Sequence, residues 1–172
     1  IFDNLDKKIV GIGEIGLDYH YTKDNKDRQI EIFEHQLNIA EKLNLPVVIH
    51  SREAAGDTLE ILKKHHNFGV IHSFSGSLEM AKEYIKLGFV LGVNGVVTFK
   101  NCNLSDTLKN IDINSIILET DSPYLTPVPF RGTQNNPAKM INTAKFVADI
   151  YGVSLSELAK ITNQNIKRIF DI

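Results

Sequence analysis

Cysteine is nearly absent from this chain of 172 residues, because Cys102 is the only one. A single cysteine excludes an internal disulfide and a structural zinc site built on thiolates, and it is typical of a reducing compartment such as the cytoplasm. Long apolar runs are missing too: none approaches the roughly 18 residues that span a bilayer, and no signal-peptide pattern is recognisable. We therefore expect a cytoplasmic protein that has no membrane partner.

Charge of either sign is not in excess. The chain has 19 Lys and Arg residues against 21 Asp and Glu residues, which leaves a formal net charge of -2. Proteins that hold nucleic acid by their overall charge are strongly basic, so any such binding here would need a local patch or metal ions. With 42% hydrophobic and 23% charged residues, the composition is ordinary for a globular protein, and the length fits one domain over residues 1–172.

The chain does have a regular alternation of short apolar runs and longer segments of helical period. The apolar runs predict strands buried on both faces at 8–16, 45–51, 68–74, 88–97 and 115–121. Apolar residues recur at steps of three and four over 28–44, 57–66 and 77–88, which predicts helices. Strands that alternate with helices favour an α/β fold with parallel strands.

Caps and breakers locate the ends of several helices. Ser77 is a predicted N-cap and Gly88 a predicted stop for the helix between them. After residue 121 a proline-rich segment predicts an irregular loop, and Asn136 with Pro137 is expected to open a helix that ends at Gly152. A last helix is expected from Ser154, because Glu157 three residues later completes a capping-box pattern.

Two α/β architectures compete, a doubly wound open sheet and a (β/α)8 barrel. The stretch "GIGEIG" (11–16) has the G-x-G-x-x-G spacing of a dinucleotide-binding turn, but its glycines lie within a strand and no helix opens directly after it. The barrel is therefore the favoured prediction.

Polar residues mark the ends of four of the five predicted strands: Glu14, His50, His72 and Asp121. In a barrel the C-terminal ends of the strands converge on one mouth, where catalytic groups gather. Because side chains alternate along a strand, all four residues can face inward together. Glu119 has the parity of Asp121 and is expected one layer deeper.

Such a gathering of ionisable groups predicts a divalent metal ion. A lone histidine after an apolar run is more often a hydrogen-bonded core or loop residue than a metal ligand. We interpret the four remaining histidines in this way: His20, His35, His65 and His66. Four inward ionisable groups, however, need a cation between them. Nitrogen and oxygen donors without sulfur suit Zn²⁺, Mn²⁺, Co²⁺ or Mg²⁺.

Two arginines are candidates for binding a substrate phosphate. Arg52 follows His50, and Arg131 lies in the proline-rich loop. A salt bridge between Arg52 and Glu53 and a solvated loop position for Arg131 are the alternatives. Asp18 could orient Arg52 or a metal ligand, or simply close a turn.

Five motifs resemble those of the TatD family of metal-dependent deoxyribonucleases, in the order and spacing of that family: "GEIGLDYH" (13–20), "PVVIHSREA" (46–54), "HSFSGS" (72–77), "ETDSPYL" (119–125) and "RGTQNNP" (131–137). The resemblance implies a TIM-type barrel that hydrolyses phosphodiester bonds of DNA, often from the 3′ end, at single-stranded or frayed ends. By motif position, Glu14 would bridge two ions of Mg²⁺, Mn²⁺ or Zn²⁺. His50 and His72 would bind one ion, while Asp121 would bind the other and act as general base.

The family's H-x-H pair on the first strand has no match in this chain. The five strands are therefore expected to correspond to the fourth to eighth of the barrel, and this chain offers clear ligands for little more than one ion. An open remnant of a barrel would expose two strand edges and invite self-association. Two alternatives remain open: an amidase, lactonase or deacylase on the same barrel, and a catalytically impaired partial barrel.

Overall fold

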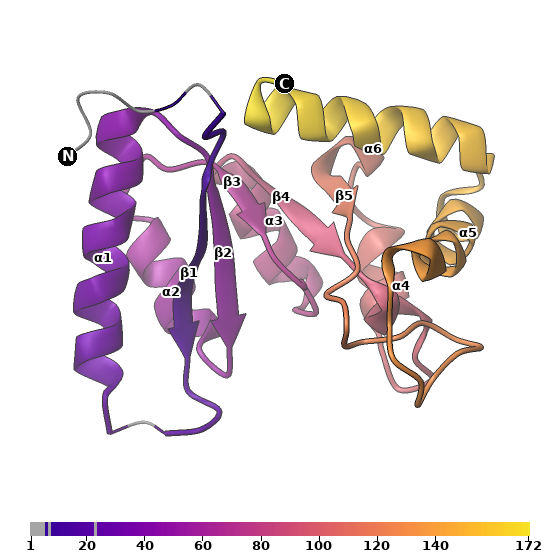
Figure 1. The fold of residues 1–172 in the computed structure, drawn as a ribbon, viewed down its shortest axis with the longest axis horizontal. Helices are drawn as coiled ribbons and strands as arrows, with labels where there is room; N and C mark the ends of the chain where they lie inside the picture. The colour runs from indigo at the N-terminus through magenta and orange to yellow at the C-terminus, as the bar shows by residue number, and fades with distance from the viewer. Residues whose placement is uncertain (1–5, 7, 23) are drawn as a thin grey trace.

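The computed structural model describes residues 6, 8–22 and 24–172. The centre of the fold in these residues is one parallel β-sheet. Its strands are β1 (Ile12–Asp18), β2 (Val47–Arg52), β3 (Gly69–Ile71), β4 (Phe89–Val93) and β5 (Ile116–Leu118). They pair in chain order, β1-β2-β3-β4-β5, and every pair is parallel. The arrowheads in Figure 1 consequently share one direction, so the carboxyl ends of the strands lie at the same edge.

The strand order decides between the two predicted architectures. A doubly wound sheet reverses its order at a switch point, whereas a barrel adds each strand beside the preceding one. This sheet shows no reversal in the described residues, so it is of the TIM-barrel type, with β1 and β5 as its two edges. Strand β1 runs past the glycines of "GIGEIG" to Asp18, and the next helix begins only at Lys26, which removes the dinucleotide-turn interpretation.

Within the described residues, six α-helices accompany the sheet: α1 (Lys26–Leu43), α2 (Ala55–Leu62), α3 (Leu78–Lys86), α4 (Leu104–Leu108), α5 (Met140–Tyr151) and α6 (Leu155–Phe170). The hydroxyl of Ser77 accepts the N–H of Met80, and that of Ser154 accepts the N–H of Glu157, as the cap predictions require. Gly152 ends α5 in the left-handed conformation, at φ 65°. None of the helices in the described ranges has the length and apolarity to cross a membrane.

Several predicted boundaries are wrong. The first strand begins at Ile12 rather than at residue 8, and β3 and β4 are shorter than their apolar runs. The chain leaves β3 at Ser73, which has a φ of 49°, and it leaves β4 through a 3-10 turn at Gly95–Thr98. Asn136 makes no side-chain cap; a 3-10 turn at Pro137–Lys139 precedes α5 instead. Helix α4 is too short to show an apolar stripe, so sequence periodicity did not reveal it.

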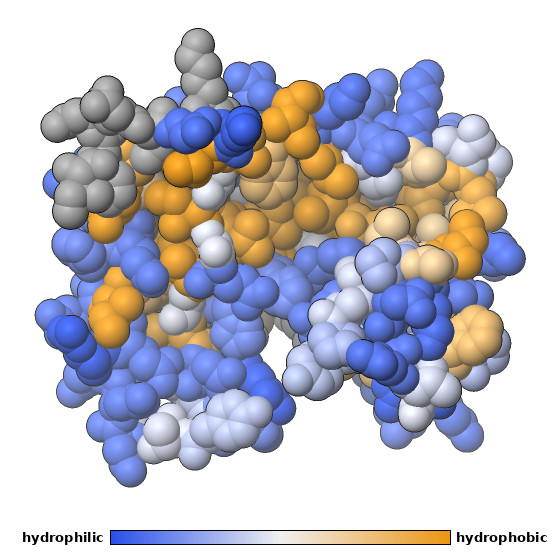
Figure 2. Space-filling view, viewed as in Figure 1, coloured by the Kyte–Doolittle hydropathy of each residue, from blue (hydrophilic) through white to orange (hydrophobic). Residues whose placement is uncertain are grey.

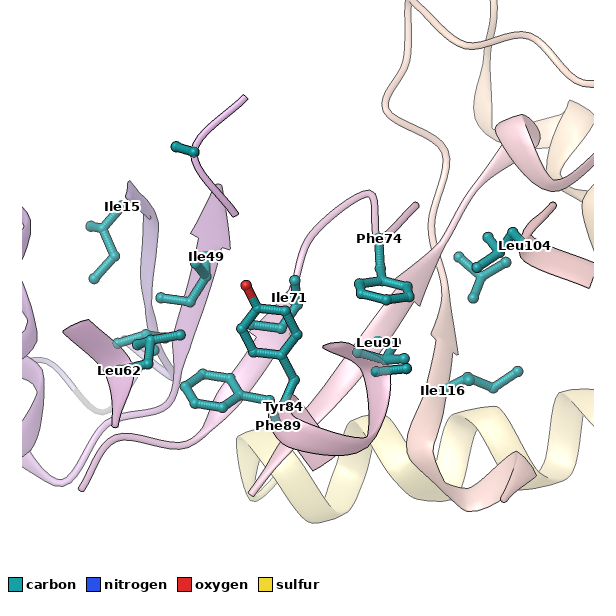
Figure 3. Close-up of a cluster of buried hydrophobic side chains, with 14 of the residues drawn as sticks. Ile15, Ile49, Leu62, Ile71, Phe74, Tyr84, Phe89, Leu91, Leu104 and Ile116 are labelled. Atoms are coloured by element: carbon teal, nitrogen blue, oxygen red, sulfur yellow. The ribbon is translucent and has the colours of Figure 1, made fainter. Parts of the chain in front are cut away.

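The main core lies on the face of the sheet that helices α1 to α5 cover (Figure 1). Strand residues such as Ile49, Ile71 and Leu91 pack there against Leu62 of α2 and Tyr84 of α3 (Figure 3). The opposite face carries a smaller cluster in which strand residues meet the end of α6: Val70, Val90, Ile117 and Ile169. Because side chains alternate along a strand, this second face continues at the carboxyl edge into the polar residues that form the candidate site.

Candidate metal centre

The four predicted metal ligands come together in one cleft at the carboxyl edge of the sheet. The cleft has a volume of about 620 Å³, and its lining includes all four of these residues: Glu14, His50, His72 and Asp121. Figure 2 shows the surface hollowed there, between the ends of β1 and β2 and the loop that follows β5. The structure therefore brings residues from four strands or the loops after them to a common space, where their side chains can act on one ligand. Glu14 and His50 lie within β1 and β2 rather than at the predicted strand ends, whereas His72 and Asp121 follow β3 and β5.

Glu14 lies between the two histidines because of an irregularity in β1. Gly13 pairs with Val48 and Ile15 with Ile49, so the register shifts at Glu14, which has no partner in β2. Such a bulge redirects the side chain at that position. One carboxylate oxygen, Oε2, lies 3.3 Å from His50 Nδ1, and the other, Oε1, lies 3.5 Å from His72 Nε2.

His72 contacts a carboxylate at each ring nitrogen. Its Nδ1 is 2.8 Å from Glu119 Oε2, while its Nε2 faces Glu14 and also lies 3.4 Å from Asp121 Oδ1. The hydrogen bond with Glu119 raises the pKa of His72 to about 9 and outweighs the opposing effect of burial. Burial raises the pKa of Asp121 above its usual value, against the lowering effect of His72.

Glu119 is held by groups that sequence analysis did not identify. The backbone N–H of Ser73 donates to Glu119 Oε1 at 2.6 Å, and the amide of Asn94 donates to the same oxygen at 3.4 Å. A Cβ on Gly92 would lie 2.7 Å from Glu119 Oε2, so this position in β4 has to be a glycine for the carboxylate to fit. Asn94 follows β4 as the other polar residues follow their strands, and this pattern could have found it.

Asp18 contacts a ring nitrogen of His50 as Glu119 contacts a ring nitrogen of His72, and it also closes a turn. Its Oδ2 lies 3.2 Å from His50 Nε2, and its Oδ1 accepts the backbone N–H of His20 at 2.9 Å. Burial acts to raise the pKa of Asp18, but these hydrogen bonds and the charge of Arg52 bring it below its usual value. Asp18 therefore closes a turn and also contacts His50, while its role in orienting a metal ligand or Arg52 stays a prediction.

The two candidate arginines are placed differently. Arg52 lines the cleft, and its guanidinium lies 5.5 Å from the centre of the Tyr21 ring. Glu53 lies 2.6 Å from His20 Nδ1, and no ion pair between Arg52 and Glu53 is among the salt bridges of the described residues. The guanidinium of Arg131 packs 3.6 Å from the centre of the Phe99 ring, and Arg131 does not line the cleft. Arg52 is thus the better placed of the two to meet a phosphate.

The donor set fits a divalent ion. In the described part of the chain, no three His, Cys, Asp or Glu side chains already surround a single metal position; the donors face one another in pairs. The pairs are 3.3 to 3.5 Å apart, and two donors bound to one tetrahedral ion at about 2.1 Å would be about 3.4 Å apart. Each histidine also has a carboxylate at its other nitrogen, which is the usual support of a metal-binding imidazole.

Comparison with known proteins finds relatives of one kind. The family model described as "TatD related DNase" matches residues 3–171. The uncharacterized metal-dependent hydrolase YabD of Bacillus subtilis is 42% identical over 170 residues, which cover 96% of this chain and 67% of YabD. The corresponding protein YcfH of Escherichia coli K12 is 42% identical over 168 residues, covering 95% of this chain and 63% of YcfH.

Solved structures agree with these matches. The TatD homologue YJJV of Escherichia coli K12 superimposes with a TM-score of 0.89 at 30% identity, covering 96% of this chain and 65% of that one. A TatD family hydrolase from Entamoeba histolytica gives a TM-score of 0.83 at 25% identity, covering 95% of this chain and 64% of that one. The chain thus spans about two-thirds of the length of the relatives it matches. Over that length, this chain belongs to the TatD-related DNase family.

Proposed function

We propose that this chain acts as a metal-dependent deoxyribonuclease that hydrolyses phosphodiester bonds. It would act as an exonuclease that removes nucleotides from the 3′ end of single-stranded or frayed DNA. The observation that carries the proposal is the position of Glu14 between His50 and His72, with Asp121 beside the same His72 nitrogen, Nε2, that faces Glu14. Family membership and the names of the curated relatives, which are called metal-dependent hydrolases, support the same chemistry.

Each residue has a distinct part in the proposed reaction. Glu14, His50, His72 and Asp121 would hold Mg²⁺, Mn²⁺ or Zn²⁺, one or two ions in number. A bound divalent ion polarises a phosphoryl oxygen and makes a nearby water more acidic. Asp121, which lines the same cleft and lies 3.4 Å from His72 Nε2, would accept the proton of the attacking water. Arg52 lines the same cleft and offsets the negative charge that develops on the phosphate.

The test is cleavage of single-stranded DNA labelled at its 5′ end, with Mg²⁺, Mn²⁺ or Zn²⁺ added and with EDTA as the metal-free reference. We expect shortening from the 3′ end that requires metal. Replacing Glu14 by Gln removes the charge between the histidines and should lower the rate at least about a hundredfold. Glu157→Gln, at an exposed position on α6, is the matched control and should leave the rate unchanged. Equal rates for Glu14→Gln and the unmodified chain would rule the proposal out.

The alternative reaction on the same site is hydrolysis of an ester or amide without phosphate. It is distinguished by turnover of p-nitrophenyl acetate against bis(p-nitrophenyl) phosphate under the same metal conditions. The nuclease proposal expects metal-dependent turnover of the phosphodiester. Exclusive turnover of the carboxylic ester would favour the alternative, and turnover of neither would favour a partial barrel without activity.

A further inference from the structure

Two exposed tyrosines stand at the rim of the candidate site. The chain has five tyrosines, of which Tyr19 and Tyr84 are buried and Tyr151 is partly buried. Tyr21 and Tyr124 are 82% and 70% exposed, and they are the two most exposed large hydrophobic side chains of the described residues. Both line the cleft that holds Glu14 and the histidines. An aromatic ring that stays in water loses the favourable free energy that its burial would give. Two such rings at one cleft therefore indicate a surface that binds a ligand.

Each tyrosine follows an acidic residue of the site by three positions in the chain. Tyr21 comes three residues after Asp18, in a turn where the Asp18 carboxylate accepts the N–H of His20. Tyr124 comes three residues after Asp121, and its N–H donates to the Asp121 carbonyl at 2.8 Å. The amide of Asn135 donates to the Tyr124 carbonyl at 2.7 Å. The two rings are therefore positioned from opposite edges of the sheet, by β1 on one side and by the loop after β5 on the other.

The contacts of Tyr21 leave room for a further partner. The edge of the His20 ring meets it at a centroid distance of 5.0 Å, and the guanidinium of Arg52 lies 5.5 Å from its centre. With these contacts in place the side chain is still 82% exposed. A planar group stacked on Tyr21 would lie beside Arg52, so a phosphate attached to that group would come near a positive charge.

The charge of the cleft also favours recognition of the bases over recognition of the phosphates. Of the described residues that line the cleft, Arg52 is the only Lys or Arg, and the same lining includes the acidic Glu14 and Asp121. Phosphate attraction by protein side chains is accordingly weak here, whereas stacking of a base on an aromatic ring is worth about 1–3 kcal/mol and tolerates any sequence.

We propose that Tyr21 and Tyr124 are stacking platforms for unpaired bases of the substrate strand, one on each side of the metal centre. The proposal rests on the deoxyribonuclease function and assigns its preference for single-stranded or frayed DNA to two side chains, whose rings stack on bases that are free and that a paired duplex does not offer. Neither tyrosine needs its hydroxyl for this role, because the ring face makes the contact.

The experiment compares binding of two fluorescein-labelled oligonucleotides in Mn²⁺, both with phosphorothioate linkages to slow cleavage. One is an oligothymidylate, and the other carries abasic residues at the same length and charge. We expect the unmodified chain to bind the base-bearing strand at least about fivefold more tightly. Tyr21→Leu and Tyr124→Leu should each weaken that binding by about fivefold or more and leave binding of the abasic strand unchanged. Tyr21→Phe and Tyr124→Phe should restore it.

The matched control is Phe146→Leu, which replaces an aromatic ring that is 38% exposed on α5 and does not line the cleft; it should bind both strands as the unmodified chain does. Equal affinity of the unmodified chain for the two strands, or unchanged binding by both leucine variants, would overturn the stacking proposal. If DNA is still cut in a metal-dependent way, the proposed function survives that result. If no DNA is cut under any metal condition, the proposed function fails and the stacking role fails with it.

Discussion

His72 has carboxylates at both ring nitrogens, and they do different things. Glu119 at Nδ1 holds the ring orientation, while Nε2 is left to face Glu14 and Asp121. An imidazole whose Nδ1 proton is held by a carboxylate presents the lone pair of Nε2 to a metal ion. His50 has a similar arrangement, with Asp18 and Glu14 at its two nitrogens. At the scale of single residues, the site thus contains two imidazoles, and each has a carboxylate at the ring nitrogen that faces away from Glu14.

Glu119→Gln tests this support. The amide cannot hold the Nδ1 proton as a carboxylate does, and it loses the charge that the Ser73 N–H stabilises. We expect the dissociation constant for Mn²⁺, measured by isothermal titration calorimetry, to rise about 10- to 100-fold. Glu157→Gln serves as the control with an unchanged constant. An unaltered affinity in Glu119→Gln would show that Glu119 does not act through His72.

At the scale of secondary-structure elements, close approach of neighbouring strands sets the geometry. Gly16 of β1 has a φ of 146°, and a Cβ there would overlap the carbonyl oxygen of His50 in β2. The two strands that carry Glu14 and His50 are thereby held close together. Strand β4 contributes no donor that faces the metal position, but it leaves the space that Glu119 fills beside Gly92.

Gly92→Ala tests whether β4 matters in this way. The added methyl group would push the Glu119 carboxylate away from His72 and Ser73, since it would lie 2.7 Å from Oε2. We expect weaker Mn²⁺ binding, by about tenfold or more, with an unchanged circular-dichroism spectrum. Gly56→Ala is the control, because a Cβ there has no neighbour within 4 Å. Full metal affinity in Gly92→Ala would contradict the role assigned to this strand.

At the scale of the whole molecule, the sheet of the described residues is open. Strands β1 and β5 each pair on one side only. Beside β5 lies an apolar groove of about 440 Å³ whose lining includes Leu118, Met140 and Ile141. Unpaired parallel edges and an exposed apolar groove favour pairing with another chain. Self-association through these edges therefore stays a prediction.

Sedimentation velocity over a range of protein concentrations measures it. We expect the average mass of the 172-residue chain to rise with concentration. Ile141→Lys places a charge in the groove and should lower that association, whereas Val128→Lys, also at an exposed position but outside the groove, should not. A monomer at every concentration would contradict the prediction.

Much of this arrangement was readable from local sequence pattern. Alternating apolar runs and helical segments predicted the parallel α/β fold, which the structure and its TatD relatives support. The polar residues at strand ends were predicted to meet, and Glu14, His50, His72 and Asp121 do line one cleft. For His50 and His72 the reason is that the period of two fixes the face of each side chain, and parallel strands run to the same edge. Glu14 lies earlier in its strand and reaches the cleft through the register shift of β1, which the alternation does not show.

Other features were decided only by the tertiary structure. Sequence pattern did not show that Gly92 makes room for Glu119, or that Arg131 packs on Phe99 away from the cleft. Nor did it show that Tyr21 and Tyr124 share one rim. Local periodicity specifies only which face of the sheet a strand side chain lies on and at which edge of the sheet the strand ends. The direction of a side chain beyond a strand end depends on turns such as the left-handed Ser73 and Asp121, and on the packing of strands far apart in the chain.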